Sequence, residues 1–295
     1  MNPNDTDKPA ASDAPVARLP GQLHVIATPI GNLGDISRRA CELLCSVDTV
    51  LCEDTRSSQK LLRHIGSQQP LMALHEHNER AQVPQLIARM QGGAQLALIS
   101  DAGTPLISDP GFRLVAAAHQ AGVRVSPVPG PCAAMAALSA AGLATDRFCF
   151  EGFLPAKPAA RRAQLARLAN ESRTMVFYEA PHRLGESLAD MAEVFGPERQ
   201  LTLARELTKA FETVLHTDLA GLCERVAKDP NQSRGEIVLV VAGAPAADDD
   251  AALAAARELY KALSAELPPS RAAKVAAKIH SVSRRDLYQP GDESH

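Results

Sequence analysis

The chain of 295 residues contains no tryptophan, and aromatic residues make up only 3% of it. Aromatic stacking is therefore a small part of whatever recognition this protein performs. No apolar run approaches the roughly 18 residues that a membrane-spanning helix needs, so we expect no such helix. Residues 1–20 have no apolar core of the kind a secretion signal carries, and we expect them to form a disordered tail.

Paired cysteine motifs are also missing. None of the six cysteines belongs to a Cys-x-x-Cys pair, and Cys41 and Cys45 lie one helical turn apart. Such spacing is typical neither of a disulfide framework nor of a zinc site. We expect buried, reduced thiols and a cytoplasmic location.

The signatures of several common active sites are absent as well. The sequence has no G-x-G-x-x-G or G-x-x-x-x-G-K-[ST] motif, which excludes the standard dinucleotide fingerprint and the P-loop. No serine elbow or Cys–His arrangement is evident either. Loops suited to binding without an obvious nucleophile are typical of an enzyme whose cofactor supplies the driving force.

Net charge is small at −3, but the basic residues are unevenly distributed. Two stretches contain no acidic residue: 155–170, with Lys157, Arg161, Arg162 and Arg167, and 271–285, with Arg271, Lys274, Lys278, Arg284 and Arg285. Local basic patches on a mildly acidic protein favour a polyanionic substrate held at defined places. Ordinary solvated helix faces are the alternative interpretation.

Apolar strand-like runs alternate with helix-like patterns through the first half of the chain. Strands are expected at 23–28, 47–52, 71–74, 96–98 and 123–128, and helices at 36–46, 57–65, 79–91, 112–120 and 132–141. This alternation predicts an α/β unit with a largely parallel sheet.

A second half begins near Phe148. It has helix-like patterns at 159–170 and 183–195 and strand-like runs at 175–178, 201–204, 213–216 and 237–241, from which we expect a mixed or antiparallel sheet. Residues 243–252 have the composition of a linker. The predicted domains are a tail over 1–20, an N-terminal α/β domain over 21–142, a C-terminal α/β domain over 143–244, and a linker with a basic helical extension over 245–295.

The run Ile99–Gly111 (Ile-Ser-Asp-Ala-Gly-Thr-Pro-Leu-Ile-Ser-Asp-Pro-Gly) is the most informative stretch. It follows a predicted strand and is too polar for the core and too long for a simple turn. Loops 28–35 and 127–132, rich in glycine and proline, also follow strands of the same half. Because the carboxyl ends of parallel strands meet at one edge, the three loops predict a small-molecule site there. Ordinary strand-to-helix turns are the alternative.

Polar clusters follow other predicted strands. Residues 53–56 read Glu-Asp-Thr-Arg and residues 75–79 read His-Glu-His-Asn-Glu. His75 and His77 could hold a metal, but a polar rim facing a substrate is favoured because no further ligand lies close by. In the second half, Arg183, Arg205 and Lys209 are candidate phosphate contacts. Pairing with Glu179, Glu206 and Glu212 is the alternative for these three.

These segments together resemble a known family. Ordered motifs at 27–35, 53–56, 99–111, 128–131, 150–155, 177–184 and 205–209 are similar to those of the ribosomal RNA small subunit methyltransferase I family, within the tetrapyrrole (corrin/porphyrin) methylase fold. The resemblance covers about residues 23–241. It implies two α/β domains with S-adenosylmethionine in a cleft between them, the class III methyltransferase arrangement. It also implies a homodimer that methylates the ribose 2'-oxygen of a cytidine in the decoding region of 16S ribosomal RNA.

Cofactor contacts follow from the resemblance position by position. In the first half they are Pro29, Ser100, Asp101, Ala102, Gly103, Thr104, Ile107, Cys132 and Ala133. From the second half, residues near Tyr178 and Gly235 are expected to close the cleft. Cys132 is a small departure, since the wider fold commonly has Ser or Thr there.

A ribose hydroxyl is a poor nucleophile, so a residue must accept its proton as the new bond forms. Spacing does not choose among the candidates, which are Glu53, Asp54, His77, Glu79, Glu179 and Lys209. Flanking phosphates are expected on Arg56, Lys157, Arg161, Arg162, Arg183, Arg205 and Lys209. No metal is expected.

Two other functions are open at this point: methylation of a tetrapyrrole at carbon, and a ribosome-binding factor without catalysis. Separately, Arg271, Lys274 and Lys278 recur at helical spacing in residues 268–289. We interpret this segment as an RNA-binding appendage, with a solvated tail helix as the alternative.

Overall fold

The computed structural model describes residues 21–245, 249–280 and 282–287; the tail predicted over 1–20 lies outside the described residues. Its first sheet has five strands in the order β3-β2-β4-β1-β5. They are β1 (Gln22–Ile26), β2 (Thr49–Cys52), β3 (Leu71–Ala73), β4 (Gln95–Leu98) and β5 (Arg124–Val128). Every neighbouring pair is parallel, as the alternation predicts.

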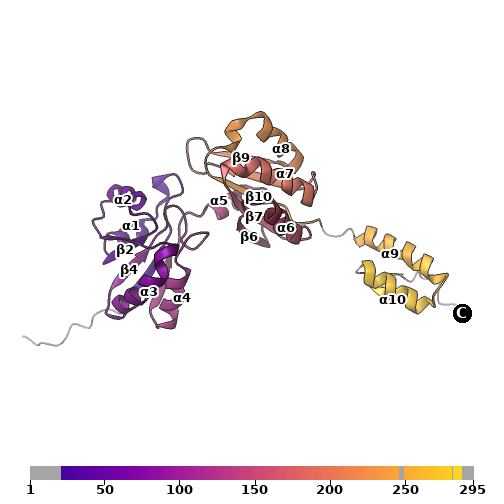
Figure 1. The fold of residues 1–295 in the computed structure, drawn as a ribbon, viewed down its shortest axis with the longest axis horizontal. Coiled ribbons are helices and arrows are strands. Elements are labelled where there is room, and N and C mark those ends of the chain that lie inside the picture. Colours follow the sequence, from indigo (N-terminus) through magenta and orange to yellow (C-terminus); the bar gives the residue numbers. More distant parts are fainter. Residues whose placement is uncertain (1–20, 246–248, 281, 288–295) are drawn as a thin grey trace, which may run out of the picture. The chain divides into compact units, whose positions relative to one another are not determined.

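Helices follow each strand of this sheet (Figure 1): α1 (Arg38–Leu44), α2 (Thr55–His64), α3 (Glu76–Gln91), α4 (Phe112–Gln120) and α5 (Ala133–Ala140). Side chains that accept from backbone amides fix two helix starts. Ser37 accepts from Ala40 N at the start of α1, and Asp54 accepts from Arg56 N at the start of α2.

Apolar side chains cover both faces of the first sheet. Leu96 and Leu98 of β4 belong to a core cluster that includes Leu86 of α3 and Leu114 of α4. The intervening Ala97 packs in the opposite cluster, whose other members include Leu44 of α1 and Leu62 of α2. Because alternate residues face opposite ways, the central strand β4 is apolar from Leu96 to Leu98, on both faces.

The second sheet is mixed, with strand order β6-β7-β10-β8-β9. Its strands are β6 (Phe148–Phe153), β7 (Thr174–Glu179), β8 (Gln200–Arg205), β9 (Thr213–Asp218) and β10 (Ile237–Val241), and its helices are α6 (Pro158–Leu168), α7 (Leu184–Phe195) and α8 (Leu219–Lys228). Strand β10 has the bounds predicted from sequence, and each of its residues is buried. Strand β6 and helix α8 are additional to the predicted elements.

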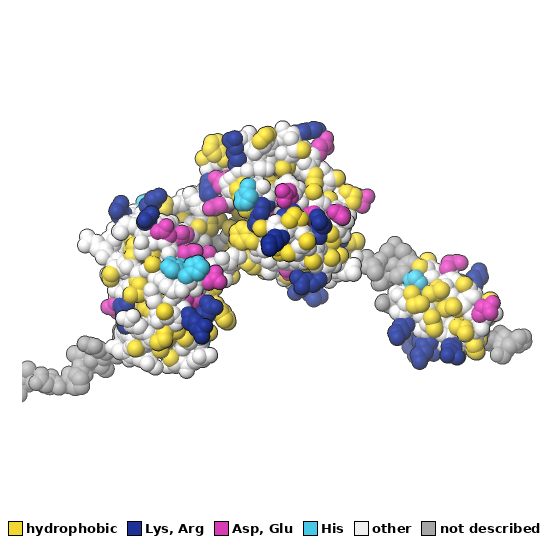
Figure 2. All heavy atoms as spheres, in the orientation of Figure 1, with side chains coloured by type: hydrophobic (Ala, Val, Ile, Leu, Met, Phe, Trp, Pro, Cys, Tyr) yellow, Lys and Arg dark blue, Asp and Glu magenta, His cyan; other side chains and the backbone are white. Residues whose placement is uncertain are grey.

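A helical pair lies at the C-terminal end: α9 (Asp249–Ser264) and α10 (Pro269–His280). Alanines hold it together, since Ala256 of α9 is buried with Ala273, Ala276 and Ala277 of α10. Helix α9 begins inside the stretch predicted to be a linker, so that prediction is wrong from Asp249 onward. Figure 2 shows Lys and Arg gathered on the edge of this segment formed by α10, where Arg271, Lys274 and Lys278 are exposed.

Contacts between α-carbons divide the chain into two compact units. The first combines residues 21–140 with 204–214 and 235–238. It therefore includes the last two residues of β8 and the first two of β10. The second contains 141–203 and 215–234 and the chain from 239 onward. The domain bounds predicted from sequence, and the cleft between the domains, stay predictions.

All six cysteines are free thiols. Cys52 is buried on β2, where burial raises the pKa of its thiol. Cys45, at the C-terminal end of α1, is exposed, so the expectation of buried thiols is wrong at this position. The expectation is confirmed in full only at Cys52, because the other four thiols are half-buried: Cys41, Cys132, Cys149 and Cys223.

Candidate active site

Three loops meet at the carboxyl edge of the first sheet. They follow β4, β1 and β5, which are neighbours in the sheet. Thr28 N donates to Gly103 O at 2.8 Å and Gly103 N donates to Thr28 O at 3.1 Å, which joins the first two loops. Thr104 Oγ1 donates to Pro131 O at 2.9 Å and joins the third. The alternation of strands and helices therefore brings these loops together, as the sequence predicts.

The loop after β4 has an unusual backbone. Gly103 has φ +83°, and a Cβ built on it would lie 3.3 Å from Ile30 Cγ2. Leu106 and Ser108 also have positive φ, at 72° and 69°, although neither is glycine. Backbone strain of this kind persists where the surroundings fix it and is concentrated at functional sites.

Carboxylates line this loop and its neighbour after β2. Asp101 Oδ1 accepts from Asp54 N at 3.2 Å, while Glu53 is exposed beside them. Burial is the main cause that raises the pKa of Asp109 to about 6. Repulsion from Glu53 and Asp101 raises this pKa further, and a hydrogen bond with Ser100 partly opposes the rise. Burial also raises the pKa of Asp101. The rim therefore carries negative charge that a cationic ligand would offset.

Residues 206–212, in the first unit, approach the loop after β1. Glu206 and Thr208 have positive φ of 52° and 66°. Lys209 Nζ donates to Glu206 Oε1 at 2.8 Å and to Glu236 Oε2 at 3.0 Å. The stem of Lys209 passes over Gly31, where an added Cβ would lie 2.4 Å from Lys209 Cγ. Beside it is a cavity of about 20 Å³, lined by Ile30, Ala133, Ala204, Leu207, Glu236 and Val238.

Of the six proton-acceptor candidates, Asp54 caps α2 and Glu179 pairs with Arg183. The other four are Glu53, His77, Glu79 and Lys209. Glu79 is buried, accepts from Leu114 N at 3.0 Å at the start of α4 and pairs with Arg113. It holds α3 to α4, so its prediction as a proton acceptor is wrong. Burial lowers the pKa of Lys209, but its bonds to Glu206 and Glu236 outweigh that and raise it, so the amine stays charged. Glu53 and His77 are exposed.

The predicted cofactor contacts divide between the two units. Pro29, Ser100–Gly103, Thr104, Ile107, Cys132, Ala133 and Gly235 belong to the first unit, and Tyr178 belongs to the second. Tyr178 contacts Phe150 and Phe153 edge-on, with ring centroids 5.0 Å and 5.5 Å apart. Its position at the end of β7 follows from the strand pairing of β6 with β7.

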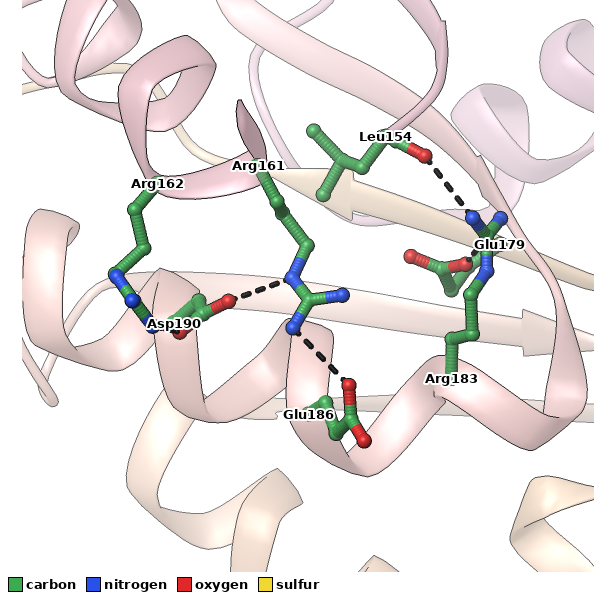
Figure 3. A network of polar contacts seen from close by, with 7 residues as sticks. All are labelled: Leu154, Arg161, Arg162, Glu179, Arg183, Glu186 and Asp190. Atoms are coloured by element: carbon green, nitrogen blue, oxygen red, sulfur yellow. Dashed lines mark hydrogen bonds and ion pairs between the residues drawn. The ribbon is translucent and has the colours of Figure 1, made fainter. Parts of the chain in front are cut away.

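A buried network in the second unit changes the interpretation of Arg161 (Figure 3). Its side chain is 2% exposed, and its Nε donates to Asp190 Oδ2 at 2.6 Å while Nη2 donates to Glu186. A guanidinium held in this way between α6 and α7 cannot reach RNA, so that prediction is wrong. Arg162, 46% exposed, is also paired with Asp190.

The other predicted RNA contacts are more accessible, to different degrees. Arg56 and Lys157 are exposed. Arg183 pairs with Glu179 at 3.0 Å and donates to Leu154 O, so the pairing alternative holds for it (Figure 3). Arg205 Nη2 donates to Thr213 Oγ1 at 2.9 Å.

Other classes of site are not supported in the described part of the chain. The rings of His75 and His77 lie 6.0 Å apart, and no group of three or more His, Cys, Asp or Glu residues there is arranged to hold a metal ion. No helix in residues 21–245, 249–280 and 282–287 is both long and apolar enough to cross a bilayer.

Comparison with known proteins decides the family. Residues 22–223 match the model of the Tetrapyrrole (Corrin/Porphyrin) Methylases. The chain belongs to this family. Residues 247–290 match the model described as the RsmI C-terminal HTH domain, which covers α9 and α10.

Among tetrapyrrole methylases, its relatives include proteins named ribosomal RNA small subunit methyltransferase I. The one from Xylella fastidiosa (strain Temecula1) is 56% identical over 91% of this chain and 98% of its own length. The one from Pseudomonas aeruginosa (strain PAO1) is 57% identical over 91% of this chain and 96% of its own length. At this identity, the chain also belongs to the ribosomal RNA small subunit methyltransferase I family within the tetrapyrrole methylases.

Solved structures of tetrapyrrole methylases share the fold. The methyltransferase CobJ superposes with a TM-score of 0.57 at 19% identity, covering 76% of this chain and 95% of that one. Uroporphyrin-III-C-methyltransferase from Thermus thermophilus gives a TM-score of 0.53 at 22% identity, covering 75% of this chain and 94% of that one.

Sequence reasoning missed some features of this candidate site. The sequence does not single out Glu236, because this residue, just before β10, contacts Lys209 from 27 positions away in the chain. Phe211 is 76% exposed two residues beyond Lys209, an unusual place for an apolar side chain. The signal that could have found it is a lone aromatic residue in a polar loop.

Proposed function

We propose that this protein transfers a methyl group from S-adenosylmethionine to the ribose 2'-oxygen of a cytidine in the decoding region of 16S ribosomal RNA. The observation that carries the proposal is identity of 56–57% over 91% of the chain to proteins named ribosomal RNA small subunit methyltransferase I. The fold alone would equally suit methylation of a tetrapyrrole, since solved structures named for that activity share it.

The residues of the three joined loops fit the donor. S-Adenosylmethionine supplies a methyl group on a cationic sulfonium, and it also carries an ammonium group. The carboxylates of Glu53, Asp101 and Asp109 repel one another, and a cationic ligand relieves that repulsion. The exposed Asp101–Ala102 backbone would hold the donor, with Pro29, Gly103, Thr104, Ile107, Cys132, Ala133, Tyr178 and Gly235 around it.

Proton removal falls to Glu53 or His77. Glu53 is exposed beside the donor loops, and His77 is exposed at the start of α3. Lys209 keeps its positive charge, and the carboxylate of Glu79 is hydrogen-bonded to the first turn of α4. Lys209 would act as a cation that favours the alkoxide form of the hydroxyl. Holding the oxygen, methyl and sulfur in line can reduce the barrier of such a displacement by several kcal/mol, on the order of what positioning supplies elsewhere.

The RNA would contact exposed cations, and the protein would act as a homodimer. Arg56 and Lys157 are the predicted phosphate contacts with exposed side chains, and Arg162, Arg183 and Arg205 contribute from positions that already have a partner. The substrate is either free 16S rRNA or the assembled small subunit.

A glycine pair gives the test a matched control. Gly103 and Gly122 both have positive φ, at +83° and +68°, but only a Cβ on Gly103 meets neighbours. We expect Gly103→Val to abolish donor binding, measured by calorimetry, whereas Gly122→Val lowers only the thermal midpoint. Wild-type protein should transfer label from the donor to one cytidine of rRNA, at the 2'-oxygen. Label in a tetrapyrrole substrate and none in rRNA would overturn the proposal.

A further inference from the structure

Helix α2 presents a basic face that the proposed function does not use beyond Arg56. From Thr55 to Leu74 the chain contains Arg56, Lys60 and Arg63 and no acidic residue. Positions four and seven residues apart lie on one face of a helix. All three cations are exposed, while Ser58, Leu61 and Leu62 turn inward.

A hollow of about 570 Å³ lies against this face. It is lined by Thr55, Arg56, Gln59, Lys60, Arg63 and Leu71. Figure 2 shows the dark blue side chains gathered over α2 on the first unit. The lining is therefore cationic and polar, with one aliphatic side chain, Leu71 of β3.

These cations have no ion-pair partner in the part of the chain that the structure describes. Other helices neutralise theirs: Arg38 pairs with Glu42 on α1, Lys228 with Glu224 on α8, and Arg162 with Asp190. An ordinary solvated helix face interleaves charges of both signs. An unneutralised row beside a hollow instead favours an external anion of extended form.

A hydrogen bond joins the start of α2 to the proposed donor loop after β4. Asp54, which caps the helix, donates its backbone amide to Asp101 Oδ1 at 3.2 Å. Arg56 therefore lies close to the loop after β4. Arg63 lies about 10 Å farther along the helix axis, at about 1.5 Å per residue.

We propose that the hollow along α2, called the α2 groove below, binds the ribose-phosphate backbone of the RNA strand next to the methylated nucleotide. Lys60 and Arg63 contact successive phosphates, and Gln59 contacts a sugar or base edge. This inference rests on the proposed function. Arginine and lysine spaced along one face suit phosphates because each guanidinium or ammonium donates several hydrogen bonds to an anion. The contacts position the strand and carry little sequence information.

The test compares two charge-matched double variants of the full chain. Lys60→Gln with Arg63→Gln alters the groove, and Arg80→Gln with Arg124→Gln removes two exposed cations from α3 and β5 that lie outside it. The probe is a protein-free 16S rRNA fragment containing the decoding region, with its affinity measured across a range of salt concentrations. Each phosphate contact contributes about −0.7 to the slope of log affinity against log salt for single-stranded RNA.

For the groove variant we expect the slope of log affinity against log salt to be shallower by about 1.4, for two contacts at about 0.7 each. Its affinity for the RNA should fall at least tenfold at moderate salt, and its affinity for the donor should not change. The control variant should keep the wild-type slope to within a few tenths. Equal slopes for groove variant and control, with wild-type methylation intact, would overturn this inference and leave the proposed function standing. Wild-type protein that neither binds nor methylates 16S rRNA, whether free or in the assembled small subunit, would overturn both. Loss of activity only on assembled subunits, with the slope on free rRNA unchanged, would assign the groove to a ribosomal protein instead.

Discussion

At the scale of single residues, Asp109 is the most perturbed carboxyl group of the donor loops. Burial raises its pKa to about 6, and Glu53 and Asp101, from two different loops, push it in the same direction. The sequence predicts a small-molecule site at the loop that contains Asp109. It could not foresee this shift, because the three carboxylates meet only after β2 and β4 pair in the sheet.

The shift predicts a pH dependence of stability. An aspartate that titrates near 3.9 in the unfolded chain and near 6 in the fold favours folding only while protonated. Its ionisation therefore destabilises the fold progressively from about pH 4 to pH 6, and the full cost remains above pH 6. We expect Asp109→Asn to raise the free energy of unfolding by about 2 kcal/mol at pH 7.5 and by nothing at pH 4.

Urea unfolding at the two pH values measures this difference. The exposed Asp146→Asn provides the control, with an expected change below about 0.5 kcal/mol at both pH values. An equal effect of Asp109→Asn at pH 4 and pH 7.5 would contradict the assignment.

At the scale of elements, the alternation of strands and helices predicted the parallel first sheet and the edge where its loops meet. That edge follows from chain direction alone, since every strand of a parallel sheet ends on the same side. The contact of Lys209 with Glu236 and the burial of Arg161 depend on packing between distant elements. Local periodicity contains no information on either, so Arg161 was placed among the surface cations.

The Arg161–Asp190 pair predicts an asymmetry between single and double substitutions. Burial opposes ionisation of Asp190, but hydrogen bonds from Arg161 and Arg162 outweigh it and lower its pKa. We expect Asp190→Ala to destabilise the protein by about 3 kcal/mol, because Arg161 is left buried and charged. Glu186→Gln, at a carboxylate 68% exposed, should cost less than about 1 kcal/mol.

The double variant Arg161→Met with Asp190→Leu should recover most of the lost stability, since no buried charge is then left without a partner, and Arg162 and Glu186 are exposed. Chemical denaturation of the three variants distinguishes these outcomes. A double variant as unstable as Asp190→Ala would show that packing, rather than the unpaired charge, sets the cost. Since Asp190 keeps its charge down to below its usual pKa, its contribution should be constant from pH 5 to 8 and lost only in strong acid.

At the scale of the whole molecule, the C-terminal pair α9–α10 is built differently from the two sheets. Its core is mainly alanine, which brings the helices close and leaves Arg271, Lys274 and Lys278 exposed on α10. The sequence predicted this helix and its cationic face. It did not predict that α9 begins at Asp249, because the run of Ala and Asp there is also typical of a linker.

If this segment binds RNA, neutralising its face has a defined result. We expect Arg271→Gln, Lys274→Gln and Lys278→Gln together to weaken binding of the 16S rRNA fragment and to reduce its salt slope by about 2, at about 0.7 per contact. Donor affinity and thermal midpoint should not change, because the three side chains are exposed. An unchanged salt slope would support the alternative of a solvated helix.

The hydrogen bonds that join Thr28 to Gly103 and Thr104 to Pro131 also restrict how this protein can vary. Residues that share partners respond to substitution together, and their effects do not add. A change in any one of the three loops displaces the other two, so a second change can restore what the first removed. We therefore expect substitutions in the three loops to occur in compensating combinations among relatives of this protein, and substitutions between the loops to occur independently.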